Sequence, residues 1–600
     1  MHGADGARRH CSTVMVFLHR RLLRTSSRSY RVLVLMIFFL VSCSRETSVV
    51  VDDNEGDSDE TVVDTTDVDS GYETDDAPLP EWAQFMITGR VLQEDGKGVA
   101  SVAVSDGLSV VNTDAKGNYR LPVSKGHVPK FVFISTPREY SAPVVNGLPV
   151  FYKHWDSCRG LESVDFIIER VSNPDRCTLL LPADPQIRSA SARSDKVAYH
   201  SIDAMKDLFR DMREYSSGIV DRNCYGMVLG DIVHESMDLF SVHLSQCATL
   251  DFPLYSVIGN HDHDTPAVGE DAQHEPFERY LGPRNYSVGF GGFHVISLDN
   301  ILVSPDGDRA YEVGVSDVDM RWLENDLSLV SKDTPLIICT HSTLFMKSTG
   351  VEVHDKARNG KAYADLLGGY DKVYNFAGHA HSSFNYVYAA DPLRGEDAPL
   401  RNVEVHVVAR SGGILWLNEY IANSGTPRGY VVCEIDGRDI TWRYRMIPYL
   451  SGTNMSDGGL PPYSYRLWSY VDGVAYVANA MLDESCQITP YGIGAYPDGC
   501  VYANVYMWDE AWGDVYLKMD SGKVYKMERV PRGDEYQYDA SEKEIYDHYN
   551  RNHSYFKDYG GKEINDVRHL FRVRPEEIHG SGTILVRDRF GEMFTAPVNW

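Results

Sequence analysis

The stretch Cys177-Thr178-Leu179-Leu180-Leu181 is a short apolar run, and Asp184-Pro185-Gln186 follows it almost at once. Three further apolar runs also precede polar residues, and they are Gly226–Leu229, Leu254–Ile258 and Leu336–Cys339. Two amphipathic stretches with the periodicity of helices, Asp195–Tyr215 and Ser316–Val330, lie between these runs. Alternating strands and helices predict a layered α/β sheet. Polar residues directly after a strand lie at its carboxyl end, where open α/β sheets bind ligands.

The composition of the chain is that of a large globular protein with several domains. Of its 600 residues, 43% are hydrophobic and 11% are aromatic. At about 150 residues per domain, this length predicts three or four units. No apolar run reaches the roughly 18 residues of a membrane-spanning helix, which excludes a polytopic membrane protein. The net charge of −28 argues against binding to a nucleic-acid duplex, because neutralising phosphates requires a basic surface.

The first 42 residues have the layout of a secretory signal peptide. They carry seven arginines and a single acid, and the ten-residue apolar run Val32–Val41 follows the basic part. The stretch Leu40-Val41-Ser42-Cys43 resembles the lipobox of bacterial lipoproteins, in which cleavage leaves an acylated cysteine. The alternative is an ordinary signal peptide in which Cys43 is incidental. Lipidation at Cys43 would anchor an exported lipoprotein to a membrane, which we expect to be the outer membrane, with possible exposure at the cell surface.

Three folded domains are expected after an acidic tether at residues 43–82. Residues 44–80 contain 13 acids and one basic residue with almost no aromatic side chains, so they cannot bury enough surface to fold. Residues 83–172 show short alternating apolar runs separated by turn signals, which predict a β-sandwich. The α/β region covers residues 175–450. After a linker rich in Gly, Ser and Pro, residues 460–600 return to short β-type runs and are predicted to form a second β domain.

Five polar motifs in the α/β region carry the functional signal, and they are specific only in combination. They are Asp184-Pro185-Gln186, Gly230-Asp231, Gly259-Asn260-His261-Asp262, His341 and Gly378-His379-Ala380-His381. In this order they resemble the motifs of the calcineurin-like metallophosphoesterases. The flanking regions resemble the N-terminal carboxypeptidase-regulatory-like and C-terminal β domains of a bacterial lipoprotein subgroup of that family. The resemblance implies a four-layer αββα sandwich flanked by two all-β domains.

The resemblance also implies a dimetal-dependent phosphatase or phosphodiesterase. The ligands implied for one ion are Asp184, Gln186, Asp231 and His381. Asp231 would bridge to the second ion, and the remaining ligands would be Asn260, His341 and His379. Two neighbouring cations repel each other, so a bridging carboxylate is physically required. Oxygen and imidazole ligands without thiolate suit Mn, Fe, Zn or Mg.

The implied reaction is attack by a metal-bound hydroxide on a phosphomonoester or phosphodiester at the cell envelope. His261 matches the family's histidine that protonates the leaving group or hydrogen-bonds a phosphoryl oxygen, and we expect Asp262 to orient its ring. The expected substrate is a phosphorylated small molecule, a phosphosugar or a lipid, since all of these present the same phosphoryl group.

One ligand position departs from the family pattern, because Gln186 stands where most members have a histidine. A neutral amide is a poorer ligand than imidazole for borderline metals. We therefore expect the first ion to bind more weakly, to be a harder metal, or to exchange with solvent. The alternative function is therefore a surface binding protein with a degenerate phosphoesterase scaffold. Other residues near the motifs are interpreted as ordinary buried or surface side chains, except that His234 is a candidate for substrate contact. The ordinary histidines are His263, His274, His354 and His406, and Asp299 is interpreted as a turn residue at a strand end.

Overall fold

The computed structural model describes residues 78–189, 201–345, 347–348, 351–390, 400–412, 422, 424, 426–447, 465–471, 474–480, 487–491, 499–530 and 569–600. Contacts divide the chain into Met1–Asp76 and Ala77–Trp600, and everything described belongs to the second unit. The predicted signal peptide, Cys43 and most of the tether lie outside the described residues. Within the described part of the chain, no helix has the length and apolar character needed to span a membrane.

The first sheet of the α/β region has five strands and begins with the apolar run that opened the sequence analysis. Its strands in spatial order are β13 (Leu254–Val257), β12 (Asn223–Leu229), β11 (Arg176–Leu181), β24 (Gly429–Asp436) and β25 (Asp439–Met446). Strands β11, β12 and β13 are parallel, with Leu179 opposite Tyr225 and Val228 opposite Ser256. Strands β24 and β25 extend the sheet in antiparallel fashion.

The second sheet has six strands, and its four central strands are parallel. In spatial order they are β14 (Tyr286–Phe290), β15 (Phe293–Leu298), β18 (Leu336–Thr340), β21 (Val373–Ala377), β23 (Val403–Val407) and β22 (Phe384–Val387). Every residue of β18 is buried. The sequence of a strand that is buried on both faces is a continuous apolar run, which is the pattern of Leu336–Cys339.

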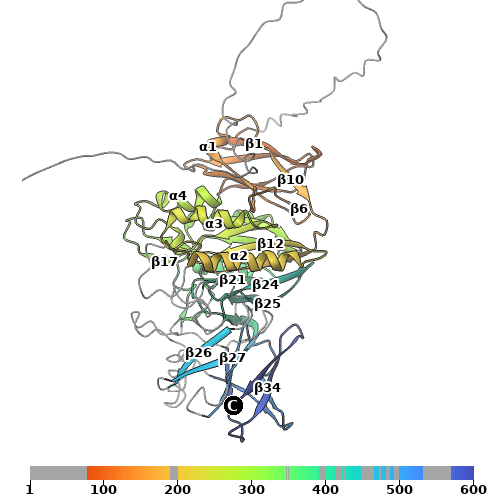
Figure 1. The fold of residues 1–600 in the computed structure, drawn as a ribbon. Helices are drawn as coiled ribbons and strands as arrows, with labels where there is room; N and C mark the ends of the chain where they lie inside the picture. Colours follow the sequence, from red (N-terminus) through yellow and green to blue (C-terminus); the bar gives the residue numbers. More distant parts are fainter. Residues whose placement is uncertain are drawn as a thin grey trace, which may run out of the picture. The chain divides into compact units, whose positions relative to one another are not determined.

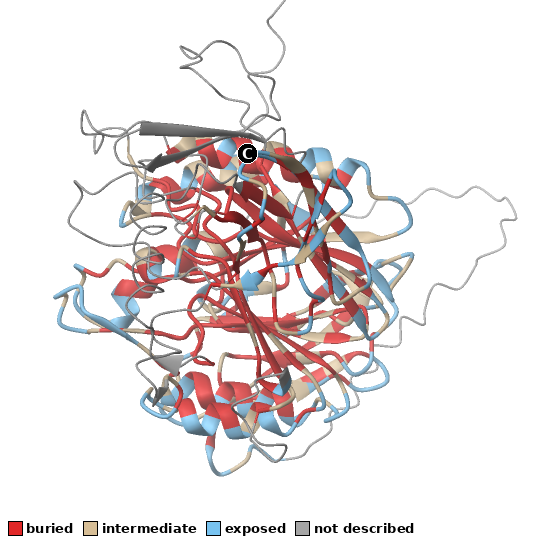
Figure 2. Ribbon diagram, turned by 90° about the horizontal axis from the view of Figure 1, so that it is seen from below, coloured by how far each residue is buried: buried red, intermediate tan, exposed pale blue. Residues whose placement is uncertain are grey.

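Helices cover the outer faces of both sheets, so the region has four layers (Figure 1). Helices α2 (Ser201–Ser217), α3 (Phe240–Cys247) and α4 (Glu270–Leu281) share a core with the first sheet, in which Phe209 packs with Leu180 and Val228. Helices α5 (Asp317–Ser328) and α6 (Gly360–Gly368) share a core with the second sheet. The buried residues run through the strands, while exposed residues lie on the outer turns (Figure 2). The predicted αββα architecture is confirmed.

Strand-rich regions flank the four layers on both sides in the sequence, as predicted. The N-terminal region has two four-stranded sheets. The strands of one are, in spatial order, β4 (Asn118–Ser124), β1 (Ala83–Gln93), β10 (Phe166–Arg170) and β6 (Tyr140–Ser141). Those of the other are β3 (Val110–Asn112), β2 (Ala103–Ser105), β5 (Phe131–Ser135) and β9 (Tyr152–His154). The C-terminal region includes two four-stranded sheets among the described residues. The strands of one are, in spatial order, β28 (Ile488–Tyr491), β29 (Val501–Val505), β33 (Leu570–Val573) and β32 (Glu528–Arg529). Those of the other are β31 (Val524–Lys526), β30 (Tyr516–Met519), β34 (Ser581–Arg587) and β35 (Met593–Asn599).

The remaining elements are short. The strand pairs are β7 (Val144–Val145) with β8 (Leu148–Pro149), β16 (Ile301–Val303) with β17 (Tyr311–Val313), β19 (Lys347–Ser348) with β20 (Val351–Glu352), and β26 (Tyr465–Val471) with β27 (Val474–Ala480). The short helices are α1 (Trp155–Cys158), η2 (Met237–Leu239), η3 (Asn260–Asp262) and η4 (Tyr388–Ala390). Of these, η3 matters for function, because it belongs to a predicted ligand motif.

Candidate dimetal centre

The five predicted motifs follow five different strands and converge in space. Their strands are β11, β12 and β13 of the first sheet and β18 and β21 of the second. In each sheet these strands are parallel, so their carboxyl ends lie at one edge. Short side-chain distances join ligands from both sheets, such as 3.0 Å between Oδ1 of Asn260 and Nε2 of His341. The structure therefore brings all seven predicted metal ligands together.

Backbone conformation aims several of these ligands. Asp184, Gln186, Asp231, His379 and His381 all have positive φ, between 43° and 65°. Such left-handed conformations are uncommon for residues other than glycine and cost on the order of 1–3 kcal/mol each when they are strained. Five of the seven predicted ligands therefore lie on backbone that the surrounding sheets must hold in place.

Two glycines in the motifs are required because side chains of the centre pack directly against them. Gly230 has φ +81°, and a Cβ at this position would lie 2.4 Å from Nδ1 of His341. A Cβ on Gly378 would lie 2.5 Å from Oδ2 of Asp184. Any other residue would displace the neighbouring ligand, which explains why glycine precedes the ligand in both motifs.

The first group of ligands consists of Asp184, Gln186 and His381, and Gln186 contacts Oδ2 of Asp231. Ligand atoms of Asp184, Asp231 and His381 all lie within 4.8 Å of one another. Nε2 of Gln186 donates to Oδ2 of Asp231 at 2.6 Å and lies 3.1 Å from Nε2 of His381. The Gln186 amide thus has the position of a ligand but presents its nitrogen. Ligation through Oε1 needs the amide turned over, which exchanges two groups of nearly equal size.

The second group of ligands surrounds the other oxygen of Asp231. Nε2 of His341 lies 3.3 Å from Oδ1 of Asp231 and 3.0 Å from Oδ1 of Asn260. Nδ1 of His379 lies 3.0 Å from the same Asn260 oxygen and 3.2 Å from Nε2 of His341. The two oxygens of Asp231 therefore face two separate ligand groups, which is the arrangement a bridging carboxylate needs.

The charges at the centre are strongly coupled. Burial lowers the pKa of His341, but the Asp231 carboxylate outweighs this effect and raises the pKa to about 10. Burial and then His341 lower the pKa of His379 to about 4. Nδ1 of His341 lies 2.9 Å from the carbonyl oxygen of Leu229, which directs Nε2 toward the ligands. Without metal, the centre thus stores a proton on His341 beside an ionised Asp231.

His261 lies at the rim of the centre, and its side chain is 25% exposed. Its backbone N–H donates to Oδ1 of Asp231 at 2.8 Å. Its ring stacks on the ring of His234 with 3.9 Å between centroids, and its Nδ1 lies 3.7 Å from Oε1 of Glu235. Burial lowers the pKa of His261. The ring is therefore held on one face by His234 and faces the carboxylate of Glu235.

The expected role of Asp262 is wrong in one respect, because this carboxylate does not orient the His261 ring. Its Oδ1 accepts from the backbone N–H of Val233 and its Oδ2 from that of Gly259, both at 2.9 Å. The turn of η3 directs Asp262 into the interior, where burial and then the charge of Asp231 raise its pKa to about 8. Asp262 braces the ligand loop, while the carboxylate beside His261 belongs to Glu235, which sequence reasoning missed.

Two of the other histidines have the ordinary roles that were expected. His406 is fully buried, and its Nδ1 lies 2.8 Å from Oδ1 of Asn385. His354 is also buried, and its ring lies 6.0 Å from that of Phe345. Neither lies in a group of side chains spaced to hold an ion among the described residues.

Metal binding to the metal-free protein should release about one proton at pH 8, because His341 must give up the proton that Asp231 holds on it. The apparent affinity should therefore rise about tenfold per pH unit below pH 10. Isothermal titration calorimetry in buffers of different ionisation enthalpy measures the released proton. His294→Gln, which removes a histidine paired with Asp326, is the control and should leave the release unchanged. Heats that do not depend on the buffer would contradict this charge assignment.

Comparisons with known proteins agree with this geometry. Three family models match successive parts of the chain: the N terminal of calcineurin-like phosphoesterase at residues 85–171, calcineurin-like phosphoesterase at 183–383, and the C terminal of calcineurin-like phosphoesterase at 406–594. None of the curated proteins compared with the chain matches it.

Similar solved structures include phosphatases from a fish and a plant. A dimetal phosphatase from Danio rerio is 14% identical, with a TM-score of 0.31 over 45% of this chain and 96% of its own. A purple acid phosphatase from yellow lupin seeds is 14% identical, with a TM-score of 0.32 over 63% and 68%. A putative 5'-nucleotidase from Staphylococcus aureus is 13% identical, with a TM-score of 0.27 over 47% and 56%.

Calcineurin-like phosphoesterases use a dimetal centre, and this chain carries candidate ligand groups for one. The matched models follow one another along the chain in the order N-terminal, catalytic and C-terminal. The chain therefore belongs to the calcineurin-like phosphoesterases and is a metal-dependent phosphoesterase.

Proposed function

We propose that this protein hydrolyses a phosphomonoester or phosphodiester at the cell envelope through seven ligands around two divalent ions. The observation that carries this proposal is the position of Asp231, whose two oxygens face two different ligand groups. Bound divalent ions in such a pair supply a nucleophile at neutral pH and neutralise the phosphoryl oxygens. The family membership of the chain supports phosphoester hydrolysis in general.

The side chains of the centre fit two divalent ions. Asp184, Asp231 and Asn260 offer oxygen, and three histidines offer nitrogen, without any thiolate. Nε2 of His341 and Nδ1 of His379 approach to 3.2 Å, a separation that requires a proton or a cation between the two nitrogen lone pairs. This donor set suits Mn, Fe, Zn or Mg. The amide of Gln186 favours the harder ions of that set at the first position.

His261 would act as a hydrogen-bond donor to a phosphoryl oxygen. Its pKa is lowered by burial, so the ring is neutral at pH 7 and holds only one proton. A neighbouring cation would lower the pKa further, which argues against a role as a charged general acid. Glu235 lies 3.7 Å from Nδ1, which is beyond hydrogen-bond distance, so the single proton of the neutral ring can sit on Nε2 and be donated from there.

Aromatic surface beside the ligands supports an organic phosphoester as substrate. The Tyr311 side chain is exposed, and its ring lies edge-on to that of His379 with 6.1 Å between centroids. An exposed aromatic ring at this distance from a ligand can pack against the organic part of a phosphorylated small molecule, phosphosugar or lipid. The substrate class is therefore an organic phosphoester.

The test is parallel turnover of 4-nitrophenyl phosphate and bis(4-nitrophenyl) phosphate with Mn, Fe, Zn and Mg. Asp231→Asn should lower kcat/KM at least about 100-fold, because losing a bridging ligand exceeds the 10–100-fold effect typical of outer ligand partners. Asp333→Asn makes the same chemical change at an exposed site and should leave the rate unchanged.

Three outcomes would change this proposal in different ways. A wild-type chain with neither bound metal nor turnover would indicate the alternative, a binding protein on a degenerate scaffold. Turnover of the monoester alone would contradict the diesterase activity. Equal rates for wild type and Asp231→Asn would contradict the assigned centre.

We infer from the Leu40-Val41-Ser42-Cys43 motif that the chain is a lipoprotein anchored to the outer membrane. Expressed from its full sequence in a bacterial host, the wild type should partition into the detergent phase of a Triton X-114 extraction, and Cys43→Ser should shift to the aqueous phase. Cys11→Ser is the matched control, because this cysteine precedes the cleavage site, and it should behave as wild type. A Cys43→Ser chain that remains in the detergent phase would contradict lipidation at Cys43.

A further inference from the structure

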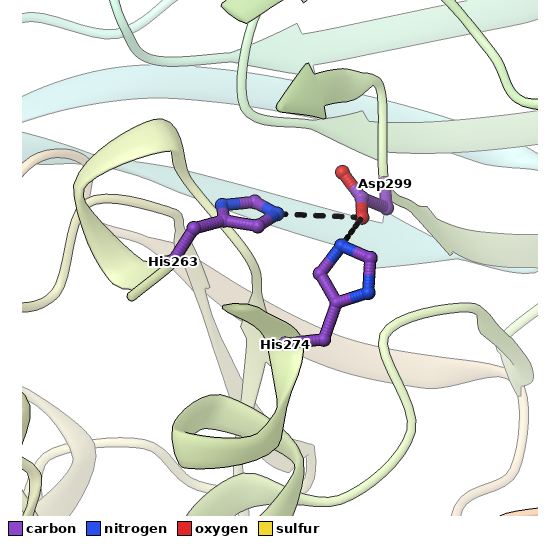
Figure 3. Close-up of side chains that lie close together, drawn as sticks. All are labelled: His263, His274 and Asp299. Atoms are coloured by element: carbon purple, nitrogen blue, oxygen red, sulfur yellow. Dashed lines mark ion pairs between the residues drawn. The ribbon is translucent and has the colours of Figure 1, made fainter. Parts of the chain in front are cut away.

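A second cluster of side chains that can bind metal shares no residue with the dimetal centre. Figure 3 shows its three side chains. It consists of His263 directly after η3, His274 on α4 and Asp299 directly after β15. Nε2 of His263 and Nε2 of His274 both point to Oδ2 of Asp299, at 3.8 and 3.9 Å. All three side chains are buried, with the His263 ring fully so. Oδ1 of Asp299 accepts from the backbone N–H of Ile301 at 3.0 Å, as expected of a residue in a turn at a strand end, while Oδ2 faces the two histidines.

The hydrogen bond on the far side of the His263 ring fixes the proton of that ring. Its Nδ1 lies 2.8 Å from the carbonyl oxygen of Gly259, which can only accept a hydrogen bond. Nδ1 therefore carries the proton, and in the neutral ring Nε2 presents a lone pair. Among the described residues this Nε2 has no hydrogen-bond partner. A buried polar atom without a partner in a native fold calls for a ligand or ion.

The distances within the cluster fit a metal ion better than a shared proton. At 3.8 and 3.9 Å the nitrogens are too far from Asp299 for hydrogen bonds. Two metal–ligand bonds of about 2.0 Å span about 3.3 Å at a tetrahedral angle, so a bound ion would draw the three ligands about half an ångström closer together. Burial and then the Arg284 guanidinium hold the pKa of His274 well below its usual value, which favours the neutral imidazole that a metal ion needs.

The charges around the cluster leave room for a divalent cation. Arg284 pairs with Asp299 and with Glu278, and its Nη1 lies 3.9 Å from Oδ2 of Asp319. Lys130 pairs with Glu278 and with Asp271, at 2.8 and 2.9 Å. Among the described residues, the Lys and Arg side chains that form ion pairs with these four carboxylates are Arg284 and Lys130. Their formal excess is two negative charges, which one divalent ion would neutralise.

A cavity gives an ion access to the cluster. It has a volume of about 730 Å³, and its lining includes His274, Asp299, Arg284 and Asn285. Three protein ligands with an adjoining cavity leave a fourth position for water. A cation therefore has both ligands and an entry path.

We propose that His263, His274 and Asp299 bind a third divalent ion of the zinc class. Two imidazoles and one carboxylate with an open position are a donor set typical of zinc, and Fe(II) is the other ion that such a set holds. The ion would tie the end of the loop Gly259–His263 to α4 and β15. Because this loop carries Asn260 and His261, the third ion would position part of the dimetal centre without contacting substrate.

The test is the metal content of the full chain in equilibrium dialysis against saturating Zn²⁺, measured by inductively coupled plasma mass spectrometry so that a weakly held ion is counted. The wild type should hold three equivalents and His274→Gln two. Asp231→Asn/His341→Ala, which removes the shared and second-site ligands of the dimetal centre, should retain one. Adding His274→Gln to that double variant should remove this last equivalent. The matched control His294→Gln lies in a directly hydrogen-bonded His–Asp pair and should keep three.

The variants separate this proposal from the proposed function. If the dimetal centre is wrong but the third site exists, wild type holds one equivalent and His274→Gln none. Equal metal content in wild type and His274→Gln would overturn the third site. So would an Asp231→Asn/His341→Ala chain without bound metal, and that variant leaves the cluster intact even if His274→Gln fails to fold.

Discussion

The proposed dimetal centre depends on one carboxylate that faces two ligand groups at once. Asp231 is buried, with Oδ2 toward Gln186 and Oδ1 toward His341. Isolating such a charge in the interior is costly, so it must be compensated by cations or hydrogen bonds. In the metal-free chain the proton on His341 and the N–H of His261 provide that compensation. Divalent ions would replace the proton and compensate the same negative charge on Asp231.

The packing of the two sheets stabilises the ligand loops in this arrangement. The strands that precede the ligands are buried and hydrogen-bonded to parallel neighbours, which leaves the connecting loops few ways to move. Positive φ at Asp184, Asp231 and His379 would be unfavourable in an isolated loop. Asp262 adds to this rigidity by accepting two backbone N–H groups across the ligand loop. The strain is thus held by packing that the strand pattern in the sequence already indicates.

Sequence reasoning reached the layered α/β fold because strand ends are visible as changes in polarity, and it reached the seven expected ligands through the resemblance of five motifs to those of the family. It did not reach contacts made between elements. Glu235 meets His261 only because two loops pack together, and Asp262 turns inward because η3 reverses its direction. The cluster of His263, His274 and Asp299 comes from a loop, a helix and a strand end, so no local spacing could reveal it. Residues distant in sequence meet through packing, which periodicity alone does not encode.

Anomalous diffraction from crystals of the full chain soaked in Mn²⁺ tests the central claim most directly. The account predicts two manganese peaks about 3.5–4 Å apart with the Asp231 carboxylate between them. One peak would be bounded by Asp184 and His381, and the other by His341 and His379. A map with no paired peaks at Asp231, at a manganese concentration that supports turnover, would contradict the dimetal account.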